Sequence, residues 1–212
     1  MPIHYEGEIQ IRKVVVGPYE NNAFVVICPQ TKESVIIDTP AEPEKVLAEA
    51  EGTHVKGILM THTHADHTAG HQEIKSKTGA PVAVHPLAAK KLSEPPEILY
   101  DHGDTFKFGN ITLQVIHTPG HTPEGISLLT GRHIFVGDSL FPGGLGHTPS
   151  PQAFKQLLKS ITERLYPLPD ETFVYPGHGS DTTIGKSKEE YAIFSQRPHP
   201  PDLHGHVQWL TG

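Results

Sequence analysis

The chain has 212 residues, of which 36% are hydrophobic, and a formal charge of −7 when its histidines are counted as neutral. This length fits one domain with its own core, which we expect to span residues 1–212. The acidic balance disfavours a nucleic-acid partner, because binding to phosphates depends on clustered lysine and arginine. The apolar runs are shorter than the roughly 20 residues that a membrane-spanning helix needs, so no membrane partner is expected.

The chain contains a single cysteine, Cys28, and 16 histidines. One cysteine excludes an internal disulfide and a cysteine-based zinc finger, and the apolar run around Cys28 indicates a core residue. The first residues carry neither a basic stretch nor an apolar one, which predicts a cytoplasmic protein. Histidine is the commonest metal ligand, so the positions of the histidines decide whether they bind metal.

The first half of the chain predicts several strands with helices between them. Turn signals separate the β-rich runs, and Pro43 stands in the first turn of a helix. The expected strands are 9–16, 23–28, 34–37, 57–60 and 82–84, and the expected helices are 43–51 and 67–78.

The second half repeats this mixture of strands and helices. The expected strands are 105–108, 111–116, 126–129, 133–136 and 173–175, and the expected helices are 151–165 and 186–194. Residues 196–212 are rich in proline and histidine and show no periodicity. We expect them to form a surface-packed extension in which His204 and His206 are solvated.

Four residues of metal-ligand type stand within six positions, directly after the expected strand at 57–60. His62 and His64 alternate as in an extended chain, so their imidazoles can point to one side and hold one metal. Asp66 and His67 follow where a helix begins, within reach of a second metal. A chance polar loop is disfavoured, because burying so many imidazoles without a metal would leave polar groups unpaired.

His67 and His71 lie four residues apart, like the histidines of the helical zinc-protease motif. That motif has a glutamate directly after its first histidine, whereas Thr68 stands there in this chain. The sequence therefore disfavours a helical protease site, and we expect His71 to be a packed or supporting histidine.

The segment from Thr61 to His67 resembles the H-x-H-x-D-H motif of the metallo-β-lactamase superfamily. Four further segments are similar to the other motifs of that family and follow its order: Asp38 with the strand before it, 117–122, 136–141 and 175–179. The resemblance extends from about Val14 to Lys188. It implies an α/β fold of the αββα type, two mixed sheets face to face with helices outside and the metals at one edge.

The resemblance also implies a two-metal site in which Asp138 bridges the ions and Asp38 supports the histidine loop. The ligands would be His62, His64 and His121 for one ion, and Asp66, His67 and His178 for the other. Two divalent ions are therefore expected. Zinc is favoured, and iron and manganese also suit histidine and aspartate ligands.

The wording of the motifs is most similar to the glyoxalase II branch, whose members hydrolyse thioesters of glutathione. This implies a small-molecule substrate and attack on its carbonyl by a hydroxide bridging the metals, with Asp66 orienting or deprotonating the water. His147 stands where that branch tends to have an arginine. It either lines the substrate pocket or is an exposed loop residue.

Other functions stay open at this point. A persulfide dioxygenase would hold one iron with His62, His121 and Asp138, a facial triad with free positions for oxygen. A lactonase and a metal-binding module without catalysis are further alternatives. His117 is a candidate supporting residue, and the other histidines outside the motifs are expected to be surface or core residues.

Overall fold

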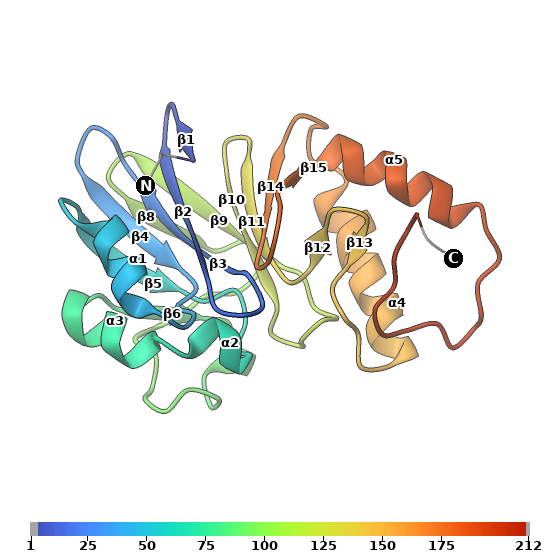
Figure 1. The fold of residues 1–212 in the computed structure, drawn as a ribbon, viewed down its shortest axis with the longest axis horizontal. Helices are drawn as coiled ribbons and strands as arrows, with labels where there is room; N and C mark the ends of the chain where they lie inside the picture. The colour runs from blue at the N-terminus through green and yellow to red at the C-terminus, as the bar shows by residue number, and fades with distance from the viewer. Residues whose placement is uncertain (1–3, 211–212) are drawn as a thin grey trace.

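The computed structural model describes residues 4–210. Two large sheets lie face to face with helices outside both, as Figure 1 shows. Helices α1 (Pro43–Ala50) and α3 (His71–Thr78) lie on the side of one sheet, and α4 (Pro151–Ser160) and α5 (Ile184–Ser195) on the side of the other. The expected αββα fold class is thereby confirmed.

The first sheet has seven strands in chain order, antiparallel up to the fourth strand and parallel from there on. They are β1 (Tyr5–Glu6), β2 (Gln10–Val16), β3 (Asn21–Ile27), β4 (Glu33–Ile37), β5 (His54–Leu59), β6 (Val82–Val84) and β7 (Ile98–Leu99). The switch to parallel pairing requires a crossover between β4 and β5, which α1 supplies.

The second sheet has six strands, and a separate hairpin follows its β11 strand. In spatial order the strands are β15 (Thr182–Thr183), β14 (Phe173–Pro176), β11 (His133–Gly137), β10 (Ile126–Thr130), β9 (Ile111–His117) and β8 (Thr105–Phe108). The hairpin consists of β12 (Leu140–Phe141) and β13 (Gly144–Leu145). The expected strands were found with shifts of a few residues, whereas the two-residue strands carry too few residues to give a periodic signal.

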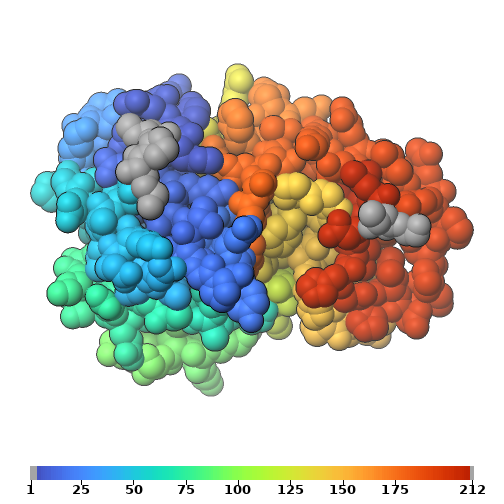
Figure 2. Space-filling model, in the orientation of Figure 1, coloured from blue at the N-terminus to red at the C-terminus, as the bar shows by residue number. Residues whose placement is uncertain are grey.

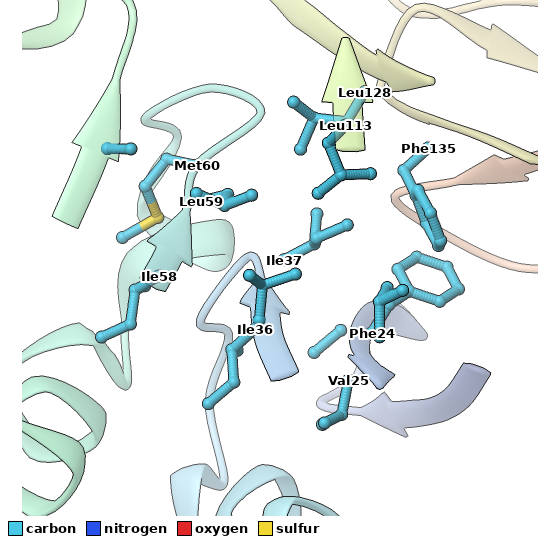
Figure 3. Packing of buried hydrophobic residues seen from close by; sticks show 14 of the residues in the cluster. Phe24, Val25, Ile36, Ile37, Ile58, Leu59, Met60, Leu113, Leu128 and Phe135 are labelled. Atoms are coloured by element: carbon cyan, nitrogen blue, oxygen red, sulfur yellow. The ribbon is translucent and has the colours of Figure 1, made fainter. Parts of the chain in front are cut away.

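The core between the sheets is built from side chains that alternate along the strands. Phe24, Ile37 and Leu59 are cross-strand partners, so they share one face of the first sheet. Figure 3 shows this face turned toward Leu113 and Phe135 of the second sheet. Burying each such side chain stabilises the fold by roughly 1.5–3 kcal/mol, and this packing fixes the distance between the two sheets.

The prediction of one continuous helix at 67–78 is wrong. The structure has α2 (Ala65–Thr68), a break, and then α3. The break arises because Thr39 N–H donates to the carbonyl of His67 at 2.9 Å, and Gly70 N–H donates to the carbonyl of Thr39 at 2.9 Å. A side chain at Gly70 would meet the Pro40 carbonyl at 2.4 Å, so only glycine fits there.

The prediction that residues 196–212 form a surface-packed extension is only partly correct. His204 and His206 are exposed as expected, but Trp209 is fully buried. Trp209 N–H donates to the carbonyl of Gly143 at 2.7 Å, which ties the tail to the β12–β13 hairpin. In Figure 2 this tail, dark red, lies beside the gold segment that contains the hairpin. Residues 211–212 lie outside the described chain.

The later helices start at recognisable N-caps. Ser150 Oγ accepts a hydrogen bond from Ala153 N–H at 3.2 Å at the start of α4, and Thr183 caps α5 in the same way. After α4 the helix expected at 151–165 continues as a π-helical turn over Ile161–Leu165.

Within residues 4–210 no helix is both long and apolar enough to cross a membrane.

Candidate metal centre

The predicted ligands follow the carboxyl ends of strands, three of which run in the same direction in the second sheet. His62 follows β5, His121 follows β9, Asp138 follows β11 and His178 follows β14. The carboxyl ends of parallel strands meet at one edge of a sheet, so these loops converge where the two sheets face each other. Binding residues on loops held by a rigid scaffold are a common arrangement in enzymes.

The first group of converging side chains is His62, His64 and His121, here called the first triplet. Their ligand atoms all lie within 4.8 Å of one another. The Nε2 atom of His121 and the Nδ1 atom of His64 are 3.0 Å apart. The first triplet therefore presents three imidazole nitrogens to one point, which is the ligand type that zinc and iron prefer.

The second group is Asp66, His67 and His178, here called the second triplet. Its ligand atoms also lie within 4.8 Å of one another. The Nε2 atoms of His67 and His178 are 3.1 Å apart, and His178 Nε2 lies 3.4 Å from Asp66 Oδ2. The second triplet thus combines two imidazoles with one carboxylate.

Asp138 lies between the two triplets. Its Oδ2 atom is 3.5 Å from His121 Nε2 in the first triplet and 3.3 Å from His178 Nε2 in the second. Its Oδ1 atom is 3.4 Å from His67 Nε2. The structure therefore brings all seven predicted ligands together, with Asp138 facing both groups.

Backbone and carboxylate oxygens hold three of the imidazoles by their outer nitrogens. Nδ1–H of His121 donates to the His147 carbonyl at 2.7 Å. Nδ1–H of His178 donates to the Tyr19 carbonyl at 2.7 Å, and Nδ1–H of His67 donates to an Asp38 oxygen at 3.0 Å. Because these oxygens only accept, each ring directs Nε2 to the centre, as metal-binding histidines do.

Asp38 connects the supports of both triplets. Its buried carboxylate accepts hydrogen bonds from Thr61 N–H at 2.8 Å and Thr61 Oγ1–H at 2.7 Å, besides the one from His67. The Thr61 hydroxyl already donates its hydrogen bond to Asp38, so its oxygen accepts from His62 Nδ1–H at 3.1 Å. The prediction that Asp38 supports the histidine loop is confirmed.

The two triplets differ in how the protein shifts the pKa of their imidazoles. Burial lowers the pKa of His62 and of His121. Burial also acts to lower the pKa of His67, but the nearby carboxylates of Asp138 and Asp38 raise it to about 10. The pKa of His178 is raised by the same Asp138 carboxylate against the effect of burial.

Two buried atoms at the centre test whether the residues fit a metal. His62 Nε2 and Asp138 Oδ1 are buried and make no hydrogen bond. Leaving such atoms unpaired costs free energy that a bound cation would remove. A methyl group at Gly177 would lie 2.3 Å from Asp138 Oδ1, so glycine there keeps the space beside the carboxylate free. The donor set and its unpaired atoms fit divalent cations.

Some residues of the centre were not predicted. Asn21 Nδ2–H donates to Asp66 Oδ2 at 3.0 Å, and a polar residue at the start of the apolar strand β3 was its only signal. Glu124 is buried next to the centre, bonded to Lys91 at 2.8 Å and to Thr63 Oγ1 at 2.8 Å. The backbone carbonyl of Tyr19 carries no sequence signal at all.

The remaining candidate histidines take other positions. His71 is buried in the core, as expected of a packed residue. His117 was a candidate support for the ligands, but it stacks on His85 with 4.2 Å between ring centroids and donates Nε2–H to the Pro123 carbonyl at 2.9 Å. His147 is an exposed loop residue that also lines a cavity above the ligands, so it has features of both positions considered for it.

Comparison with known proteins agrees with this arrangement. A profile described as the metallo-beta-lactamase superfamily matches residues 16–178. A hydroxyacylglutathione hydrolase from Polaromonas sp. strain JS666 is 36% identical over 76% of this chain, which spans 62% of that relative. The hydroxyacylglutathione hydrolase GloC of Haemophilus influenzae is 29% identical over 89% of this chain and over its own full length.

Solved structures give the same result. The B3 metallo-beta-lactamase BLEG-1 superposes with a TM-score of 0.79 at 29% identity, covering 84% of this chain and 96% of its own. TTHA1623, solved in a di-iron-bound form, has a TM-score of 0.68 at 33% identity, covering 84% and 96%. With its fold, its converging histidines and its matching profile, the chain belongs to the metallo-beta-lactamase superfamily.

Proposed function

We propose that the chain is a binuclear metal-dependent hydrolase that cleaves thioesters, as glyoxalase II enzymes do. The observation that carries the proposal is the pair of ligand triplets on either side of Asp138. The names of the Polaromonas and Haemophilus relatives support a thioester substrate, and the di-iron form of TTHA1623 supports two metal ions.

The first triplet would hold one ion, the second triplet the other, and Asp138 would contact both. When bound, two such ions polarise a substrate carbonyl and lower the pKa of bound water to about 7. Zinc is the metal we favour, and iron or manganese would also suit the ligands. The chain's own contribution is a set of imidazoles held in place before substrate arrives, which removes reorganisation from the reaction.

Asp66 is the residue we propose to orient the attacking water. Burial acts to raise its pKa, but the hydrogen bond from Asn21 lowers the pKa below the usual range. Asp66 is therefore charged at neutral pH and a weak proton acceptor, because a general base works best with a pKa near the operating pH. Its role is to accept a hydrogen bond from the water and so direct its lone pair.

The first experiment is elemental analysis of protein purified without added metal, combined with a thioester hydrolysis assay on the same sample. We expect about two equivalents of metal, as in other two-metal hydrolases, and thioester turnover that disappears when the metals are chelated. One equivalent of iron together with no thioester hydrolysis would overturn the proposal.

A second candidate, the persulfide dioxygenase, uses part of the same site. His121 Nε2 and Asp138 Oδ2 are 3.5 Å apart, and the buried His62 Nε2 is unpaired, so these three could hold one iron. In a dioxygenase with one iron, the second triplet would bind no metal, which is why we favour the hydrolase. Oxygen uptake with glutathione persulfide would favour the dioxygenase, and acid release from an acyl-lactone would favour a lactonase.

A further inference from the structure

The cavity above the proposed metals has a volume of about 740 Å³. Ligands from both triplets form its floor. Its wall comes from segments that are distant in the sequence: Tyr19 in the loop before β3, the β12–β13 hairpin with the loop after it, and the C-terminal tail. A ligand that fills this cavity would therefore contact the tail.

The tail presents its side chains in alternation. Val207 and Trp209 are buried, whereas His206 and Gln208 are exposed and line the cavity. Trp209 packs edge-on to the ring of Tyr191, with centroids 5.5 Å apart, and its carbonyl accepts a hydrogen bond from Arg197. Anchoring by Trp209 thus fixes which tail residues face the substrate.

The lining carries little charge away from the metals. Among the residues that the structure describes around the cavity, the only acidic side chains are the proposed ligands Asp66 and Asp138, and none is lysine or arginine. Phe141, Pro142 and Leu145 supply apolar surface. The polar groups of the wall are the hydroxyl of Tyr19, the amide of Gln208 and two imidazoles, those of His147 and His206, whose centroids are 4.7 Å apart.

This lining discriminates between possible thiol portions of a thioester. A carboxylate that enters the cavity loses water, and it gains no lysine or arginine partner from the wall. Glutathione carries a carboxylate at both ends of the tripeptide. A thiol portion that bears only amides loses less on desolvation and finds a hydrogen-bonding partner in Gln208.

We propose, building on the thioesterase function above, that this enzyme selects thioesters whose thiol portion is uncharged, and that His206 and Gln208 of the tail determine this specificity. The acyl group lies toward the ligands on the floor, because the carbonyl has to reach them. The thiol portion lies along the wall formed by the hairpin and the tail.

The test compares two thioesters with the same lactoyl group on the metal-loaded full chain, one of N-acetylcysteamine and one of glutathione. We expect kcat/KM to be about tenfold higher or more for the uncharged thioester, because a carboxylate in the wall loses water and gains no charged partner. A higher kcat/KM for the glutathione thioester would overturn the inference.

Two variants that each introduce a lysine test whether the wall of the cavity controls the preference between the two thioesters. Gln208→Lys adds a cation to the wall and should shift the ratio of kcat/KM toward the glutathione thioester by about tenfold. His204→Lys adds the same residue to the same tail, but His204 lies outside the lining, so the ratio should stay within about twofold. Equal shifts in both variants would mean that net charge, rather than the wall, controls selection.

Truncating the wall residues tests their hydrogen bonds without adding charge. Gln208→Ala should lower kcat/KM for the N-acetylcysteamine thioester about three- to tenfold, the equivalent of one hydrogen bond. His206→Ala should act in the same direction. No change in either variant would contradict their assignment as specificity-determining residues.

Binding of uncleavable thioethers separates this inference from the proposed function. Calorimetry would compare S-hexyl-N-acetylcysteamine with S-hexylglutathione on the metal-loaded protein. Tighter binding of the uncharged thioether without hydrolysis of either thioester would sink the proposed function and leave the inference standing. Tighter binding of S-hexylglutathione would sink the inference even if thioesters are cleaved.

Discussion

The first and second triplets lie on either side of Asp138, yet the protein shifts the pKa values of their imidazoles differently. In the first triplet, burial lowers the pKa of His62 and His121, so both present lone pairs at neutral pH. In the second, the carboxylates around His67 raise its pKa to about 10, so the metal-free protein keeps it protonated. At neutral pH His62 and His121 can therefore bind a metal directly, whereas His67 has to release a proton first.

The cause of this difference is the distribution of negative charge. His67 contacts Asp138 on one ring nitrogen and Asp38 on the other, whereas Nδ1 of His121 donates to an uncharged carbonyl. A carboxylate pair stabilises either a proton or a metal on the ring between them. The second triplet should thus bind metal tightly, but only by releasing protons.

Removing the charge shared by the triplets should have the largest effect. Asp138→Asn keeps the shape but withdraws the carboxylate that faces both groups, so we expect metal content to fall below one equivalent. Hydrolysis should fall by a factor of about 10³ or more, as when a main electrostatic group of an active site is lost. Elemental analysis and kcat/KM check this.

The matched control is Asp170→Asn, which removes an exposed carboxylate that pairs with Lys188. It should leave metal content and activity unchanged, because exposed ion pairs contribute little. Two bound metals and full activity in Asp138→Asn would show that the triplets do not depend on a shared carboxylate.

Asp38→Asn should have the second-largest effect, because Asp38 supports both triplets without facing the metals. The variant weakens the hold on His67 and on the Thr61–His62 pair, so we expect metal affinity to fall about 10- to 100-fold. Competition with a chelator measures this loss. A loss confined to one equivalent of metal would mean that only one triplet relies on Asp38.

The difference in pKa predicts that the triplets respond unequally to pH. His67 stays protonated between pH 6 and 8, so each unit of falling pH should lower the affinity of the second triplet up to about tenfold per proton released. His62 and His121 have already lost their protons near pH 7, so the first triplet should change less.

Two single-site variants make this measurable. His121→Ala damages the first triplet and leaves the second, while His178→Ala does the reverse. The logarithm of metal affinity should rise more steeply with pH in His121→Ala. Equal slopes would show that proton release is shared by the two groups.

The raised pKa also has a consequence for the metal-free protein. Because the folded pKa of His67 lies above its unfolded value of about 6.5, its charged contacts contribute stability that is fully present below about pH 6.5. That stability is lost as the pH rises through about 10. We expect the Tm of the metal-free protein to fall from pH 7 to pH 10, and a constant Tm would contradict this.

Asn21→Ala should have the smallest effect. It removes one hydrogen bond to Asp66 and leaves the other ligands in place, so kcat should fall about three- to tenfold. Asn22→Ala would be an unsuitable control, because Asn22 holds the Pro176 carbonyl in the last ligand loop. Gln114→Ala, on the β9 strand away from the centre, is suitable.

The positions of the strands and the ligand segments were predictable because their signals are local. An apolar run followed by a turn residue marks a strand end; four such ends carry the segments that contain the ligands, and a fifth carries Asp38. The break between α2 and α3 was not predictable, because it depends on Thr39, a residue distant in the sequence that bonds to His67 and Gly70.

The sequence by itself predicted the fold class and the seven candidate ligands at strand ends, because its local motifs resemble those of the metallo-β-lactamase superfamily. Only the tertiary structure decided the pKa difference between the triplets, because it depends on which oxygens surround each imidazole. It alone also decided that the tail forms a wall of the cavity. The outward direction of His206 and Gln208 exists only once Trp209 is buried, and that burial depends on contacts with distant segments.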